Sequence, residues 1–207
     1  MIGPSMRAPT IAIVDYGAGN LNSVKKAFDY LGADVVVTTQ PEIVATADKI
    51  VLPGVGHFSV LGGIERSGLR NALLQSARGG KPFLGICLGM QWLFEGSDEA
   101  PELAGAGFFA GCCRPFPATV KSPHVGWNSL TVREGSRLMR KVAPDSFVYY
   151  IHSFQSPVVA ATTATSEHGT QFSAAVEQEN IFGVQFHPEK SWEVGLLILK
   201  NFCEVNL

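Results

Sequence analysis

The chain has 207 residues, of which 46% are hydrophobic and only 16% are charged, so it can bury a core as one compact domain. Its 16 basic and 18 acidic residues give a net charge of −2 without a basic stripe, which argues against nucleic acid as a partner. No apolar run reaches the roughly 18 residues that a membrane span requires, and residues 1–9 lack the hydrophobic region of a signal peptide. We therefore expect a cytoplasmic protein with a loose tail at residues 1–9 and one domain at residues 10–207.

The first half of the chain alternates short apolar runs with helical patterns, which is typical of a parallel α/β sheet. The runs that predict strands lie at residues 10–17, 33–39, 49–54 and 81–86. Between the first two, apolar residues recur at helical spacing over residues 21–31, until Gly32 stops them. Continuous Val, Ile and Leu runs suit strands covered on both faces, and ligands of open sheets bind beyond the carboxyl ends of their strands.

From about residue 107 the sequence changes to aromatic and β-branched segments, which predict a mostly antiparallel extension of the sheet. Residues 191–205 predict a closing helix with Ser191 as its N-cap. The expected fold class is thus α/β, with a central, mostly parallel sheet, helices on both faces and an antiparallel extension.

The pentapeptide GICLG, residues 85–89, places Cys87 where an apolar run turns into a helical pattern. Glycines two residues to either side remove side chains from a sharp strand-to-helix turn, as in the G-x-S-x-G nucleophile elbow. That geometry would put the thiol at a helix N-terminus, which favours thiolate, and would direct the backbone N–H of Leu88 toward an oxyanion. The motif is short and free cysteine is often buried, so on its own it leaves a packing role open.

A cysteine nucleophile needs a base, and the base needs an orienting group. His187 ends an apolar strand, and Glu189 follows it across Pro188. We expect the two side chains on the same side of an extended segment, where the carboxylate accepts the proton of one imidazole nitrogen. His57, after the glycine loop PGVG, is better placed to mark the rim of an oxyanion site, and His168 lies in a polar turn where we expect it to be solvated.

Three segments, LPGVGHF, GICLGMQ and GVQFHPE, occur in the order and at about the separations of class I glutamine amidotransferases with a Cys-His-Glu triad. The chain resembles that family over nearly its whole length. The resemblance implies a flavodoxin-like fold and hydrolysis of glutamine to glutamate and ammonia through a cysteine thioester, without a cofactor. It implies Cys87 as nucleophile, His187 as base and Glu189 as the residue that orients His187. The substrate-binding residues that it implies are Gln91, Gly54, Val55, Gly56, Leu88, His152 and Ser153. We find no metal-ligand cluster in the sequence.

Further segments distinguish members of this class by the acceptor of their ammonia. DYGAGNLNSV near the start, SPHVGWNSL at residues 122–130, YYIHSF and HPEKS together resemble the glutaminase subunits of imidazole glycerol phosphate synthases of histidine biosynthesis. That resemblance implies a heterodimer with a separate (β/α)8 cyclase, which receives the ammonia. It also implies that Asn20, Trp127, Tyr149 and Lys190 lie at or near the cyclase-facing surface.

Other hypotheses remain open from the sequence. A class I glutaminase could serve another acceptor, as in anthranilate or pyridoxal phosphate synthases, although PHVGWN argues against this. A cysteine peptidase or stress protein could carry an elbow cysteine on a similar sheet, and a dead homologue could only bind a partner. At single positions, Asn20 could be a helix N-cap, Tyr149 a packed strand residue and Lys190 a solvated charge.

Overall fold

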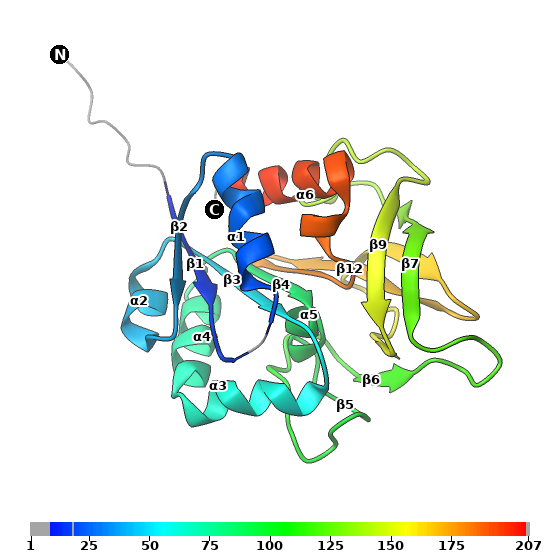
Figure 1. Cartoon of the computed structure of the whole chain (residues 1–207), viewed down its shortest axis with the longest axis horizontal. Coiled ribbons are helices and arrows are strands. Elements are labelled where there is room, and N and C mark those ends of the chain that lie inside the picture. The colour runs from blue at the N-terminus through cyan, green and yellow to red at the C-terminus, as the bar shows by residue number, and fades with distance from the viewer. Residues whose placement is uncertain (1–8, 18, 206–207) are drawn as a thin grey trace.

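A computed structural model describes residues 9–17 and 19–205 of the chain and contains an eight-stranded sheet (Figure 1). Five neighbouring strands run parallel, in the spatial order β2 (Asp34–Thr38), β1 (Thr10–Val14), β3 (Lys49–Gly54), β4 (Phe83–Cys87) and β13 (Ile181–Val184). Three antiparallel strands continue the sheet: β12 (Gln171–Gln178), β11 (Thr162–Glu167) and β8 (Thr131–Val132). The predicted parallel sheet with an antiparallel extension is confirmed.

Helices cover both faces of this sheet, so the molecule has three layers (Figure 1). One face carries α1 (Leu21–Tyr30) and α6 (Trp192–Glu204). The other carries α2 (Pro41–Thr46), α3 (Gly62–Arg66), α4 (Leu69–Arg78) and α5 (Leu88–Trp92). Two short 3₁₀ helices, η1 (Phe58–Leu61) and η2 (Pro188–Lys190), follow β3 and β13.

Each face of the sheet has its own hydrophobic core. In the first, the rings of Phe28 on α1 and Phe202 on α6 meet edge to face, with their centroids 6.4 Å apart. In the second, Trp92 of α5 stacks on Phe83 of β4 at 6.1 Å. Fully burying a phenylalanine side chain stabilises the fold by about 1.5–3 kcal/mol, so these helices are held mainly by apolar contacts with the sheet.

Two smaller sheets lie beside the main one. β7 (His124–Ser129) pairs antiparallel with β9 (Phe147–His152), and the strands β10 (Phe154–Gln155), β6 (Cys112–Pro115) and β5 (Gly96–Ser97) form the other sheet. The β7–β9 register pairs His124 with His152 and Trp127 with Tyr149. Because side chains alternate along a strand, the two histidines are buried while Trp127 is 42% exposed.

Three local expectations are corrected. β2 is the outer edge of the sheet, so Val37 is 36% exposed, whereas its apolar run suggested burial on both faces. His168 is half-buried and stacks on His124 with ring centroids 4.3 Å apart, rather than being solvated. Ser191 stands at the N-cap position of α6 but makes no capping hydrogen bond; its hydroxyl donates to the carbonyl of His187 at 2.7 Å. For β2 the position at the sheet edge, and for His168 and Ser191 a tertiary contact, overrides the local pattern.

The predicted tail at residues 1–9 lies outside the described residues except for Pro9, and both the tail and the domain at residues 10–207 stay predictions. Within the described ranges, the helices are too short or too polar to cross a membrane.

Candidate active site

The strand-to-helix turn at Cys87 is a constrained piece of backbone. β4 ends on Cys87 with φ 53° and ψ −105°, a conformation that residues other than glycine rarely adopt, and α5 begins at the next residue. A Cβ atom on Gly85 would lie 2.5 Å from the carbonyl oxygen of Gly89, and one on Gly89 would lie 1.8 Å from that of Leu52. The glycines of GICLG are therefore required by close backbone contacts, as a sharp turn demands.

The carboxyl ends of three adjacent strands meet at this turn. Gly54, at the end of β3, is in register with Cys87, and Val184, at the end of β13, is in register with Ile86. A Cβ atom on Gly54 would lie 2.1 Å from the hydroxyl oxygen of Tyr16, so a larger residue would not fit there. The strand order β3-β4-β13 thus brings together three motifs that lie far apart in the sequence.

His187 and Glu189 form a buried pair just beyond β13. Their side chains are 1% and 0% exposed, and Nδ1 of His187 lies 2.8 Å from Oε1 of Glu189. Nδ2 of Asn20 donates a hydrogen bond to the same carboxylate oxygen. Among the described residues, Nε2 of His187 and Oε2 of Glu189 have no hydrogen-bond partner. The nitrogen needed for proton transfer is therefore unoccupied.

The local backbone of this pair differs from the prediction. His187 is extended, but residues Pro188–Lys190 form the 3₁₀ turn η2 instead of continuing an extended segment. The two side chains meet across this turn. It is also held from behind, because a Cβ atom on Gly195 of α6 would lie 1.9 Å from the carbonyl oxygen of Pro188.

The charges around Cys87 favour a proton on His187. Burial opposes that positive charge, but a thiolate at Cys87 and the carboxylate of Glu189 outweigh burial and raise the pKa of His187 to about 10. Burial, and then the negative charge of Cys87, raise the pKa of the nearby Tyr16 hydroxyl, which stays neutral. The arrangement suits an imidazolium that faces an ionised cysteine.

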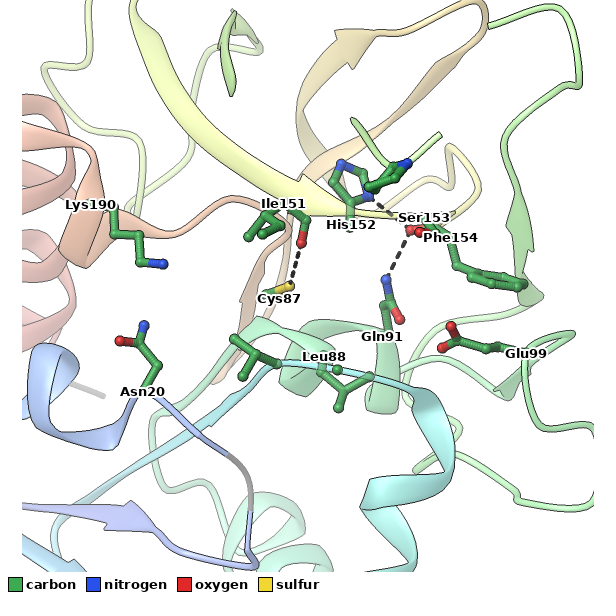
Figure 2. Close-up of a pocket in the computed structure, with 13 residues that line it drawn as sticks. Asn20, Cys87, Leu88, Gln91, Glu99, Ile151, His152, Ser153, Phe154 and Lys190 are labelled. Atoms are coloured by element: carbon green, nitrogen blue, oxygen red, sulfur yellow. Dashed lines mark hydrogen bonds between the residues drawn. The ribbon is translucent and has the colours of Figure 1, made fainter. Parts of the chain in front are cut away.

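A pocket of about 510 Å³ opens beside Cys87 (Figure 2). Figure 2 shows Asn20 and Lys190 on one side of Cys87, and Gln91 and Glu99 on the other. The residues that line this pocket are Asn20, Val55, Gly56, Cys87, Leu88, Gln91, Glu99, Pro123, Ile151, His152, Ser153, Phe154 and Lys190. Six of the seven expected substrate-binding residues are among them; the seventh, Gly54, is buried in β3 against Tyr16.

A family model of class I glutamine amidotransferases matches residues 12–205, a range that holds Cys87, His187, Glu189 and the whole pocket lining. The chain belongs to the class I glutamine amidotransferase family. The resemblance seen in the sequence is thereby confirmed.

Relatives that match nearly the whole length of this amidotransferase carry the name of one synthase subunit. It is 46% identical over 197 residues to the imidazole glycerol phosphate synthase subunit HisH of Methanothermobacter thermautotrophicus, which covers 94% of this chain and 98% of the relative. It is 44% identical over 204 residues to the same subunit of Deinococcus radiodurans, with coverages of 96% and 95%.

Solved structures share the fold of this amidotransferase. A crystal structure of a glutamine amidotransferase superposes with a TM-score of 0.73 at 18% identity, and covers 94% of this chain and 99% of the other. PurLQS from Thermotoga maritima superposes with a TM-score of 0.71 at 18% identity, with coverages of 95% and 98%.

Sequence reasoning missed several residues of the pocket. Glu99 is one of three acidic residues within residues 98–102, so no local pattern distinguishes it. Its Oε2 accepts a hydrogen bond from the backbone N–H of Phe58 at 2.7 Å. Ile151 and Phe154 present backbone carbonyls, 3.9 Å from Sγ of Cys87 and 2.9 Å from Nε2 of Gln91 respectively. Every residue carries a backbone carbonyl, so such a role leaves no sequence signal.

The four residues expected to face a partner extend outward from the pocket. Asn20 and Lys190 lie in its lining, and Nζ of Lys190 is 5.8 Å from the ring centroid of Tyr149. The ring of Tyr149 in turn meets Trp127 edge to face at 5.9 Å. Asn20 occupies the N-cap position of α1, yet its side chain makes no capping bond there and reaches Glu189 instead.

Proposed function

We propose that this chain is the glutamine-hydrolysing subunit of an imidazole glycerol phosphate synthase, and that it supplies ammonia to a separate (β/α)8 cyclase in the cytoplasm. The constrained Cys87 beside the buried His187–Glu189 pair is the observation that carries the glutaminase reaction. The choice of acceptor rests on relatives that are named as subunits of that synthase and match nearly the whole chain.

The reaction follows from the residues at the turn. Sγ of Cys87 attacks the carboxamide carbon of glutamine, and His187 holds the thiol proton on Nε2 and gives it to the departing nitrogen. Ammonia leaves and a thioester remains on Cys87. His187 then takes a proton from water, which attacks the thioester and releases glutamate. The backbone N–H of Leu88, at the start of α5, and those of Val55 and Gly56 are the candidate donors to the oxyanion.

The two sides of the pocket suit different parts of the substrate. The carboxylate of Glu99 can pair with the α-ammonium group of an amino acid, and Gln91 lies on the same side (Figure 2). A glutamine held there would extend its carboxamide toward Cys87. Asn20 and Lys190 lie beyond Cys87, on the side where ammonia would leave.

The surface beyond that exit side is the proposed cyclase-facing surface. It comprises Asn20, Lys190, Tyr149 and Trp127. Asn20 and Lys190 line the pocket, the ammonium group of Lys190 lies over the ring of Tyr149, and that ring contacts Trp127. Aromatic residues are enriched at the centres of protein interfaces, and the exposed Trp127 fits that role.

Glutamate release tests both parts of this proposal. Wild type, Cys87→Ala and Cys112→Ala would be assayed with and without a cyclase of this synthase and its nucleotide substrate. Cys112 is exposed and unpaired, so its substitution controls for the loss of a thiol alone. We expect Cys87→Ala to lose about 10³-fold or more in activity, since the nucleophile is absent, and Cys112→Ala to match wild type.

Two outcomes would contradict the proposal. Glutamine-dependent turnover by Cys87→Ala would exclude the thioester mechanism. A wild-type chain that fails to support the cyclase with glutamine, while free ammonia does support it, would refute the assigned acceptor and favour another synthase.

A further inference from the structure

Gln185 is a fully buried amide that contacts both Cys87 and Gln91, two residues of the pocket lining. It follows β13 directly, two residues before His187, and its exposed fraction is 0%. Its backbone N–H donates to the carbonyl of Ala174 at 2.8 Å, which holds it to β12. Buried amides need hydrogen-bond partners, so the contacts of this side chain indicate what it does.

The direction of each hydrogen bond around Gln185 is set by a backbone carbonyl. The carbonyl oxygen of Phe154 can only accept, so the group of Gln91 that lies 2.9 Å away must be its amide nitrogen. The same nitrogen lies 3.1 Å from Oε1 of Gln185, which accepts its second hydrogen. Nε2 of Gln185 is therefore turned toward Cys87, where it lies 3.6 Å from Sγ.

Two neutral groups lie beside Cys87, the carbonyl of Ile151 and the amide of Gln185, and they interact differently with its thiol and thiolate forms. A thiol can donate to the carbonyl of Ile151, 3.9 Å from Sγ, whereas a thiolate cannot. The N–H of Gln185 can donate to a thiolate and gains strength as the sulfur becomes negative. Gln185 thus favours the ionised nucleophile without adding a charge.

The same side chain also sets how Gln91 meets a ligand. Both hydrogens of the Gln91 amide are used by Phe154 and Gln185. The remaining polar atom of Gln91 is its oxygen, which can only accept a hydrogen bond. Gln91 is therefore arranged to bind an N–H group of the substrate.

We propose that Gln185 is a further catalytic residue of this glutaminase, which donates a hydrogen bond to the sulfur of Cys87 and holds Gln91 with its oxygen toward the pocket. The proposal rests on Cys87 being the nucleophile. Its two effects are separable, because the donor acts on the reactivity of sulfur and the acceptor acts on substrate binding.

Two variants separate these effects. Gln185→Met keeps the length of the side chain and removes both donor and acceptor. Gln185→Glu keeps an acceptor for Gln91 but places a carboxylate in the position of the donor. Gln171→Met is the matched control, since Gln171 is an exposed glutamine on the adjacent strand β12.

The first readout needs neither glutamine nor a partner. Iodoacetamide would be used at pH 8, and peptide mass spectrometry would follow alkylation of Cys87, with the exposed Cys112 as an internal reference. We expect both Gln185 variants to slow alkylation of Cys87 by about tenfold or more, the range for losing one hydrogen bond to a charged group. Cys112, and both cysteines of Gln171→Met, should react at wild-type rates.

The second readout is glutamine hydrolysis with the cyclase present. In Gln185→Met we expect kcat to fall and KM to rise about tenfold, because Gln91 is free to rotate. In Gln185→Glu we expect KM to stay within about threefold of wild type while kcat falls, because Gln91 is still held.

Wild-type alkylation of Cys87 in either variant that folds would overturn the role of the donor. An unchanged KM in Gln185→Met would overturn the role in holding Gln91. These failures differ from failure of the proposed function, in which Cys87→Ala itself would keep turnover. Because the glutamate variant nearly matches the native shape, it decides the role of the donor if the methionine variant does not fold.

Discussion

Glu189 is a buried carboxylate with an uneven set of partners. One oxygen accepts from both His187 and Asn20, while the other has no hydrogen-bond partner among the described residues. An unsatisfied buried carboxylate is costly unless a positive charge lies close to it. The imidazolium of His187 supplies that charge, so the pair is most stable when His187 is protonated. The structure thereby favours the form of His187 that can protonate a leaving amine.

Glu189→Gln should keep the shape of the His187–Glu189 pair and remove the negative charge of the carboxylate. The neutral amide no longer stabilises the imidazolium, so the pKa of His187 falls and less of the general acid is present at a given pH. We expect kcat to fall by about 10²- to 10⁴-fold, and the alkaline limb of the pH–rate profile to move to lower pH. Glutamine hydrolysis with the cyclase, measured from pH 6 to pH 10, checks this.

Glu42→Gln is the control for the loss of one carboxylate, because Glu42 is exposed in the first turn of α2 and lies outside both the pocket lining and the proposed cyclase-facing surface. If Glu189→Gln kept the wild-type profile, Glu189 would not orient or charge His187.

At the scale of elements, the β7–β9 pair is joined to the pocket by a chain of neutral histidines. Nδ1 of His124 lies 3.1 Å from Nε2 of His152, and Nδ1 of His152 donates to the carbonyl of Phe154 at 2.8 Å. That carbonyl also receives Gln91. The carbonyl requires a proton on Nδ1 of His152, so Nε2 of His152 accepts from His124. A second proton on Nε2 of His152 would break this chain, and one on Nε2 of His124 would displace the hydrogen bond from Nδ2 of Asn128.

Burial disfavours such a proton, and the neighbouring histidines add to the effect. Burial, and then His168, lower the pKa of His124 to about 4. Burial chiefly lowers the pKa of His152 to about 3, against the hydrogen bond to Phe154. Below about pH 6.5 the unfolded chain binds protons at these positions and the folded chain does not, so stability falls as pH falls from about 6.5 to about 4. His187 adds little there, because it is protonated in both states below about pH 6.

We expect the free energy of unfolding in urea to fall by up to about 1.4 kcal/mol per pH unit for each of the two histidines between pH 6 and pH 5. His124→Gln should reduce this slope by about half, since one titrating ring remains. A slope that is equal in His124→Gln and wild type would show that the histidine chain does not set the acid sensitivity.

At the scale of the whole molecule, the site needs segments from both halves of the chain. Hydrophobic patterning is sufficient for four of the five parallel strands and for α1 and α6. It places the fifth, β13, in the segment expected to be mostly antiparallel, although β13 pairs parallel with β4. It could not reveal the order of strands, and so it misjudged the edge strand β2. Motifs identified Cys87, His187 and Glu189, whereas Glu99 and the carbonyl of Phe154 act through tertiary position alone. Local sequence patterns therefore predict the reacting groups better than they predict the groups that surround them.

Trp127 on β7 and Tyr149 on β9 continue a row of contacts that begins at Lys190 in the pocket lining. Trp127 is 42% exposed and contacts Tyr149 and Trp192, which is itself 77% exposed. Large exposed aromatic side chains that cluster in this way mark protein interfaces. If the cyclase covers this surface, removing one central ring should weaken the complex and leave the nucleophile intact.

We expect Trp127→Ser to raise the Kd for the cyclase by about 30-fold, the loss typical of an aromatic residue at the centre of an interface. Partner-dependent glutaminase activity at low cyclase concentration should fall accordingly and return when cyclase is in excess. Alkylation of Cys87 in the isolated chain should not change, because Trp127 lies outside the pocket lining. Val37→Ser is the control: it removes an exposed apolar side chain at the far edge strand β2 and should bind the cyclase as wild type does. Titration calorimetry with the two variants decides the matter, since an unchanged Kd for Trp127→Ser would place the cyclase on another face.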